Sequence, residues 1–112
     1  MEIVAAAVFA VAALGGVFLA VRHLRGLALP GSVAVIHGVA AATALVLLAI
    51  AVVMNDLGGG ATVALVIFVV AALGGFYLAS FHLRGERHPT PIVLGHGLIA
   101  VVAFLTLLVA IV

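Results

Sequence analysis

Cysteine is absent from this 112-residue sequence and charge is scarce, since only four residues are Lys or Arg and three are Asp or Glu. Without cysteine the chain has no disulfides, no thiolate metal ligands and no cysteine nucleophile. A formal net charge of +1 is too small for the basic surface that binds nucleic acid. The polar groups left for chemistry are five histidines, the few charged residues and some hydroxyls.

Hydrophobic residues make up 69% of the chain, which leaves too little polar surface to cover a soluble globule. The sequence therefore predicts an integral membrane protein in contact with the lipid bilayer. A bilayer core about 30 Å thick needs roughly 20 apolar residues per helix, so the length allows about four spans. The apolar runs place these spans at residues 3–21, 33–54, 61–81 and 92–112.

The basic residues fall in two of the connections between spans and predict the orientation of the chain. Because positive residues are retained in the cytoplasm, the first and third connections are expected there and both termini outside. We expect the inner (plasma) membrane of a bacterium as the location. The residues concerned are Arg22, Arg25, Arg84 and Arg87.

The second half of the sequence repeats the first at a constant offset of 59 residues. Matches of glycine, histidine, arginine and proline in one register are hard to obtain by chance, so they indicate a duplicated helical hairpin. The matches are Ala-Ala-Leu-Gly-Gly at 12–16 and 71–75, His-Leu-Arg-Gly at 23–26 and 82–85, Pro30 and Pro89, and His-Gly at 37–38 and 96–97.

A repeat of two spans keeps its orientation in the membrane, so we expect parallel hairpins related by a pseudo-twofold axis along the membrane normal. The predicted fold class is an all-α membrane protein with four transmembrane helices in an up-down-up-down bundle. One transmembrane domain covers 1–112, with hairpin repeats at 1–54 and 61–112. Residues 55–60, which include three consecutive glycines, are predicted to be the linker.

Small residues recur at every fourth position of the first and third spans. Such stripes let helix backbones, or a flat cofactor, approach closely in lipid, where no hydrophobic effect drives helices together. Gly16 and Gly75 belong to these stripes, and Gly38 and Gly97 each follow a histidine. We expect close packing at all four glycines.

His37 and His96 are equivalent under the repeat and lie about 10 Å inside their spans, at 1.5 Å per residue. Ionisable side chains at membrane depth usually face the bundle interior and mark function. A purely structural alternative is a hydrogen bond from each imidazole to a carbonyl of a neighbouring helix.

His23 and His82 form a second equivalent pair near the cytoplasmic ends of their helices. Each lies seven residues after a stripe glycine, and therefore on the same helix face. Anchoring of the helix ends at the membrane interface is an alternative for this pair. His88, which has Leu29 at its equivalent position, is expected to be a loop residue.

Neutral imidazoles without thiolates or buried carboxylates suit bis-histidine ligation of haem iron. His37 and His96, on diagonal helices at one depth, are the first candidates for axial ligands, and haem b is the expected cofactor. The glycines would leave room for the porphyrin edge. Candidate partners of its propionates are the four arginines at the cytoplasmic rim, Arg22, Arg25, Arg84 and Arg87.

This arrangement of histidines resembles the membrane-embedded b-type cytochromes, in which histidines of different transmembrane helices hold haem inside a bundle. The resemblance implies transfer of one electron, with quinone or a redox protein as partner. It implies an electron carrier rather than an enzyme with a substrate of its own. The chain departs from the common pattern of two histidines along one helix at opposite membrane faces, because its histidines all lie on one side.

The sequence leaves the occupant of the histidine layer open. One haem on His37 and His96, or two haems that also use His23 and His82, are both compatible with the spacing. A second hypothesis is a non-haem Zn, Cu, Ni or Fe ion held by the four histidines. A third is a scaffold subunit of a homo-oligomer or a larger membrane complex, in which the histidines only form hydrogen bonds.

Overall fold

The structure is a computed structural model that describes residues 1–54 and 58–112. Four α-helices account for nearly all of these residues, and each is long and apolar enough to cross a membrane. The chain is therefore an integral membrane protein of the all-α class. The helices are α1 (Glu2–Leu24), α2 (Gly31–Met54), α3 (Gly59–Leu83) and α4 (Thr90–Ile111).

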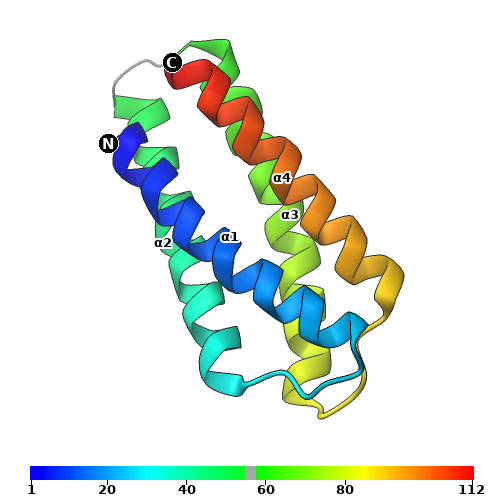
Figure 1. The fold of residues 1–112 in the computed structure, drawn as a ribbon. Helices are drawn as coiled ribbons and strands as arrows, with labels where there is room; N and C mark the ends of the chain where they lie inside the picture. Colours follow the sequence, from blue (N-terminus) through cyan, green and yellow to red (C-terminus); the bar gives the residue numbers. More distant parts are fainter. Residues whose placement is uncertain (55–57) are drawn as a thin grey trace.

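The helices form an up-down bundle with overall dimensions of 43 × 23 × 20 Å, as predicted (Figure 1). α1 packs most closely on α2 and α3 on α4, while α1 also contacts α4 and α2 contacts α3. The diagonal pairs are therefore α1 with α3 and α2 with α4. Both termini lie at one end of the bundle (Figure 1). The opposite end holds loops 25–30 and 84–89 and is called the arginine end below.

The two helices that arrive at the arginine end terminate in the same way. Gly26 and Gly85 adopt positive φ angles of 69° and 66°, a conformation that only glycine enters readily. The backbone N–H of Gly26 donates to the His23 carbonyl and that of Leu27 to the Arg22 carbonyl, which is the Schellman arrangement. The second loop has the corresponding bonds from Gly85 and Glu86. Glycine thus fixes where α1 and α3 end.

The observed helices are longer than the predicted spans at the arginine end. α1 continues beyond residue 21 to Leu24 and α3 beyond residue 81 to Leu83, because no residue before Gly26 or Gly85 breaks the helix. α3 begins at Gly59, inside the predicted linker 55–60. Residues 55–57 of that linker lie outside the described residues.

The apolar core fills the half of the bundle nearer the termini. Phe9 of α1 and Phe68 of α3 stack across the diagonal with ring centroids 3.7 Å apart and ring planes within 1°. Leu48 and Leu107 on the other diagonal pair are fully buried. Alanines surround these side chains. Large side chains fill only some levels of the core, so the four helices can pack closely.

Truncation of a core leucine tests this packing. Leu48→Ala removes a side chain with 0% exposure, so we expect the free energy of unfolding to fall by about 2–4 kcal/mol. The matched control is Leu14→Ala, because Leu14 is 75% exposed and faces lipid. Its expected effect is within about 0.5 kcal/mol. Unfolding by SDS in mixed micelles measures both, and equal effects would contradict the assigned core.

Candidate functional site

His37 and His96 each form a hydrogen bond to the helix beside them. The Nδ1 atom of His37 donates to the Ala12 carbonyl of α1 over 2.7 Å, and Nδ1 of His96 donates to the Ala71 carbonyl of α3, also over 2.7 Å. A carbonyl oxygen only accepts, so Nδ1 must carry the proton in both rings. The Nε2 atom of each neutral ring therefore has a free lone pair, which is the donor that metals bind.

The two imidazoles also lie close to one another across the bundle. Their ring centroids are 6.3 Å apart and their planes are nearly perpendicular, at 87°. They come from α2 and α4, which form a diagonal pair, so the rings meet near the centre of the four helices. Two imidazoles bound to one metal ion from opposite sides, with metal–nitrogen bonds of about 2 Å, have ring centroids about 6 Å apart.

The stripe glycines provide the space in which these rings lie. A Cβ added at Gly16 would come within 2.9 Å of Cε1 of His37, and one added at Gly75 within 3.1 Å of Cε1 of His96. Close packing at these two glycines is therefore a contact between a helix backbone and an imidazole. Gly38 and Gly97 differ, because a Cβ at either position would meet no atom within 4 Å.

His23 and His82 occupy different surroundings despite their equivalent positions. His23 is 5% exposed, and its Nε2 atom is hydrogen-bonded to Oγ1 of Thr90 at the start of α4 over 2.9 Å. Gly31 takes the place of Thr90 in the first hairpin and has no hydroxyl to offer. Nε2 of His82 lies 3.6 Å from the position that a Cβ on Gly31 would take.

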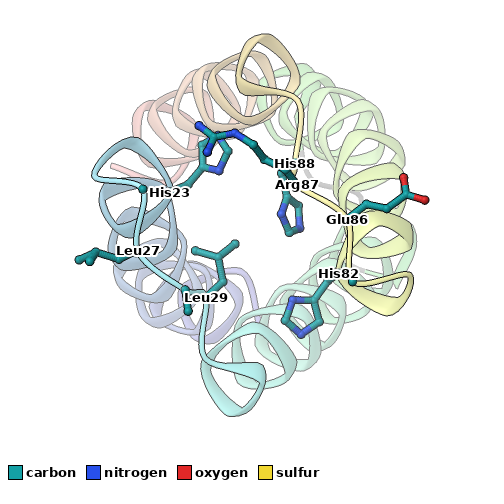
Figure 2. A pocket seen from close by; sticks show the side chains of 10 residues that line it. His23, Leu27, Leu29, His82, Glu86, Arg87 and His88 are labelled. Atoms are coloured by element: carbon teal, nitrogen blue, oxygen red, sulfur yellow. The ribbon is translucent and has the colours of Figure 1, made fainter.

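His88 lies between these two histidines at the arginine end. Its ring centroid is 6.1 Å from that of His23 and 6.1 Å from that of His82. The three rings line a cavity of about 390 Å³ at this end of the bundle. In Figure 2 His88 points into the cavity, and the Arg87 side chain extends across it toward His23.

The four arginines predicted to meet propionates are placed differently from one another. Arg22 donates to the Ala28 carbonyl over 2.6 Å, and Arg84 donates to the Ser80 carbonyl over 3.1 Å. Both guanidinium groups are thus held against their own hairpins. Arg25 is exposed, and Arg87 is the arginine that lines the cavity.

The histidines do not converge on one point. Within residues 1–54 and 58–112, no group of three or more His, Asp or Glu side chains is close enough to hold a metal ion together. The structure instead brings His37 and His96 together as one pair. His23, His82 and His88 gather separately around the cavity.

Sequence reasoning missed the contributions of Thr90 and His88. Thr90 was not singled out. His88 is a loop residue, as predicted, but its place beside His23 and His82 was not predicted. A signal was present, because both residues are departures from the repeat. Gly31 and Leu29 stand at the equivalent positions of the first hairpin.

The chain matches no family model, and no curated protein or solved structure shows significant similarity to it. The class that the fold and site define is a four-helix membrane bundle with a central pair of histidines. Its function has to be inferred from the chemistry of these side chains.

Substitution of a stripe glycine tests the contact between Gly16 and His37. Gly16→Ala places a methyl group 2.9 Å from Cε1, so the His37 ring must shift and its bond to the Ala12 carbonyl must lengthen. We expect changed ¹⁵N shifts of the His37 ring in NMR spectra. Gly38→Ala is the control, since its methyl group would meet nothing within 4 Å. Unchanged His37 shifts in Gly16→Ala would contradict the contact.

The surroundings of His88 predict a dependence of stability on pH. Burial, followed by the nearby His23 and His82, holds the pKa of His88 below its usual value. The unfolded chain then binds more protons at this site, so His88 costs stability as the pH falls below about 6.5. We expect His88→Leu to lose less stability than the wild type between pH 7.5 and pH 5.5. Thermal unfolding in detergent measures this difference, and parallel pH profiles would refute it.

Proposed function

We propose that the protein is a membrane haem b protein in which His37 and His96 are the axial ligands and which carries one electron. The observation that carries the proposal is the geometry of this pair. Both Nδ1 atoms donate to backbone carbonyls over 2.7 Å, and the ring centroids lie 6.3 Å apart. Histidine ligands of metals commonly donate their other ring N–H to such a carbonyl, which fixes the tautomer and the ring orientation.

The pair favours haem over a bare metal ion because it offers only two nitrogen ligands. A structural zinc site needs about four protein ligands. No third His, Asp or Glu among the described residues is positioned to join the pair. A porphyrin supplies four nitrogen ligands of its own and requires two more from the protein. The two neighbouring imidazoles could supply them.

The environment of the pair also suits a porphyrin. Toward the termini the neighbouring core is apolar and includes Phe9 and Phe68. Toward the arginine end lies the cavity lined by Arg87 and His88. An apolar interior with a basic opening suits a macrocycle that carries two carboxylates.

A single haem is favoured over two by the state of His23. Its Nε2 atom already bonds to Thr90, so it would have to exchange that partner for iron. Its equivalent, His82, has no threonine beside it, and the two are therefore not matched as a ligand pair. We infer one haem on His37 and His96.

The paired contacts support a pseudo-twofold arrangement of the two hairpins. Phe9 meets Phe68 and His37 meets His96, and each pair is separated by the 59-residue offset of the sequence repeat. We infer an axis along the membrane normal between the members of each pair. The iron position would lie on that axis and so draw one ligand from each hairpin.

Bound iron supplies one-electron chemistry by changing between its ferric and ferrous states. The residues of the chain orient the ligands through the Ala12 and Ala71 carbonyls and exclude water on the side of the termini. The arginines favour a cytoplasmic location for the arginine end. A quinone or a redox protein is the proposed partner, and the plasma membrane of a bacterium is the proposed location.

Reduced-minus-oxidised absorption spectra of protein purified from haem-supplied cells test the proposal. We expect a low-spin haem b spectrum that is lost in His37→Ala and in His96→Ala, because each substitution removes one axial ligand. His82→Ala is the matched control, since His82 lies in the same bundle but outside the pair, and it should retain the spectrum.

The alternatives give different results in the same preparation. Loss of the spectrum in His82→Ala as well would contradict the single site and favour two haems. A metal found by elemental analysis without a haem spectrum would refute haem and favour a non-haem site. Neither metal nor haem would leave the histidines as structural groups of a scaffold protein.

A further inference from the structure

The cavity at the arginine end combines several basic groups with few acidic ones. His23 approaches it from α1, His82 from α3, and Arg87 and His88 from loop 84–89. In Figure 2 the Arg87 guanidinium lies over the opening beside His23, and His88 points into its centre. One fixed positive charge and three imidazoles thus share the lining of one cavity with Leu27, Ala28 and Leu29 of the first loop.

Glu86 is the acidic residue that borders this cavity, but its side chain points away from it (Figure 2). An oxygen of its carboxylate lies 3.9 Å from a guanidinium nitrogen of Arg84, and both side chains are about half exposed. Glu86 is therefore paired outside the cavity. The positive charge of Arg87 is not cancelled within it.

The turn itself does not require these polar residues. Loop 25–30 makes the same Schellman turn as loop 84–89 and likewise ends in proline, yet it has Leu27, Ala28 and Leu29 where the second loop has Glu86, Arg87 and His88. In the first loop the equivalent of His88 is an apolar side chain. The polar residues of the second loop are thus not required for folding of the turn.

We propose that this cavity is an oxyanion-binding site in which Arg87 and His88 hold a carboxylate or phosphate group. Arginine forms strong charge-assisted hydrogen bonds to such groups, and an imidazole N–H supplies a further donor. A volume of about 390 Å³ lies within the usual range of small-ligand pockets. The site does not depend on the haem proposal, because its residues are separate from His37 and His96.

Two sources supply an oxyanion of this kind. One is a propionate of a porphyrin bound at the histidine pair, and the other is a small phosphate or carboxylate from the aqueous side. Both present the same chemistry to Arg87 and His88. Measurements on haem-free and haem-loaded protein distinguish them.

Titration with inorganic phosphate tests the site in the haem-free, full-length protein, held in an uncharged detergent and labelled with ¹⁵N-histidine. We expect saturable shifts of the His88 and His23 ring signals, with small changes at His37 and His96. Sodium chloride at equal ionic strength is the control for nonspecific screening. Phosphate shifts no larger than those with chloride would overturn the proposal.

Three variants locate the binding groups. Arg87→Gln should weaken phosphate binding about tenfold or more, because it removes the charge-assisted hydrogen bonds. His88→Leu, which copies Leu29 of the first loop, should weaken it as well. The matched control Arg25→Gln should change affinity less than twofold, since Arg25 is exposed and does not line the cavity. Equal weakening by Arg25→Gln and Arg87→Gln would overturn the assignment.

Repetition with haem-loaded protein identifies the source of the oxyanion. Loss of phosphate binding on loading would support the site and assign it to a propionate. Retained binding would support the site and assign it to a soluble anion. If the protein takes up no haem, the phosphate titration still tests the anion site. Failure of the haem proposal can therefore be distinguished from failure of the anion-site proposal.

Discussion

The hydrogen bonds from His37 to the Ala12 carbonyl and from His96 to the Ala71 carbonyl determine most of the site. In lipid an unbonded imidazole is costly, and a carbonyl within a helix retains a lone pair that can accept a second bond. Each bond ties the two helices of one hairpin together. It also selects the tautomer, fixes the plane of the ring and leaves Nε2 available. The same hydrogen bond thus stabilises the hairpin and orients the imidazole.

The four helices could be predicted from the apolar runs, because each run is long enough to cross a bilayer and the few charged residues lie almost entirely between the runs. The shared level of His37 and His96 followed from the repeat and from helix rise. Their acceptors could not be predicted, because every residue has a carbonyl and only packing selects Ala12 and Ala71. The role of Gly16 was only partly visible. The sequence indicated a close approach, but not that an imidazole would be the group that fills it.

The two hairpins carry the same residues at some buried levels and different residues around the cavity. Phe9 and Phe68, like Leu48 and Leu107, are the same residue at positions 59 apart, and each fills half of a tightly packed level. At the arginine end, Thr90 differs from Gly31 and His88 from Leu29. Loops at a membrane surface meet water, so a polar replacement there costs little stability. The residues that distinguish the cavity from the first hairpin thus lie in loop 84–89 and at the first residue of α4, while the buried core holds the helices that carry the central histidines.

The stacked rings of Phe9 and Phe68 have a consequence for the spacing of the central histidines. They lie one helical turn beyond Ala12 and Ala71, between the histidine pair and the termini, and the buried side chains around them are apolar. Ala12 and Ala71 accept the hydrogen bonds of the two central histidines, so the level at which α1 and α3 meet through these rings also sets the separation of the two accepting carbonyls. A substitution of either phenylalanine would therefore change the separation of the imidazoles one turn away.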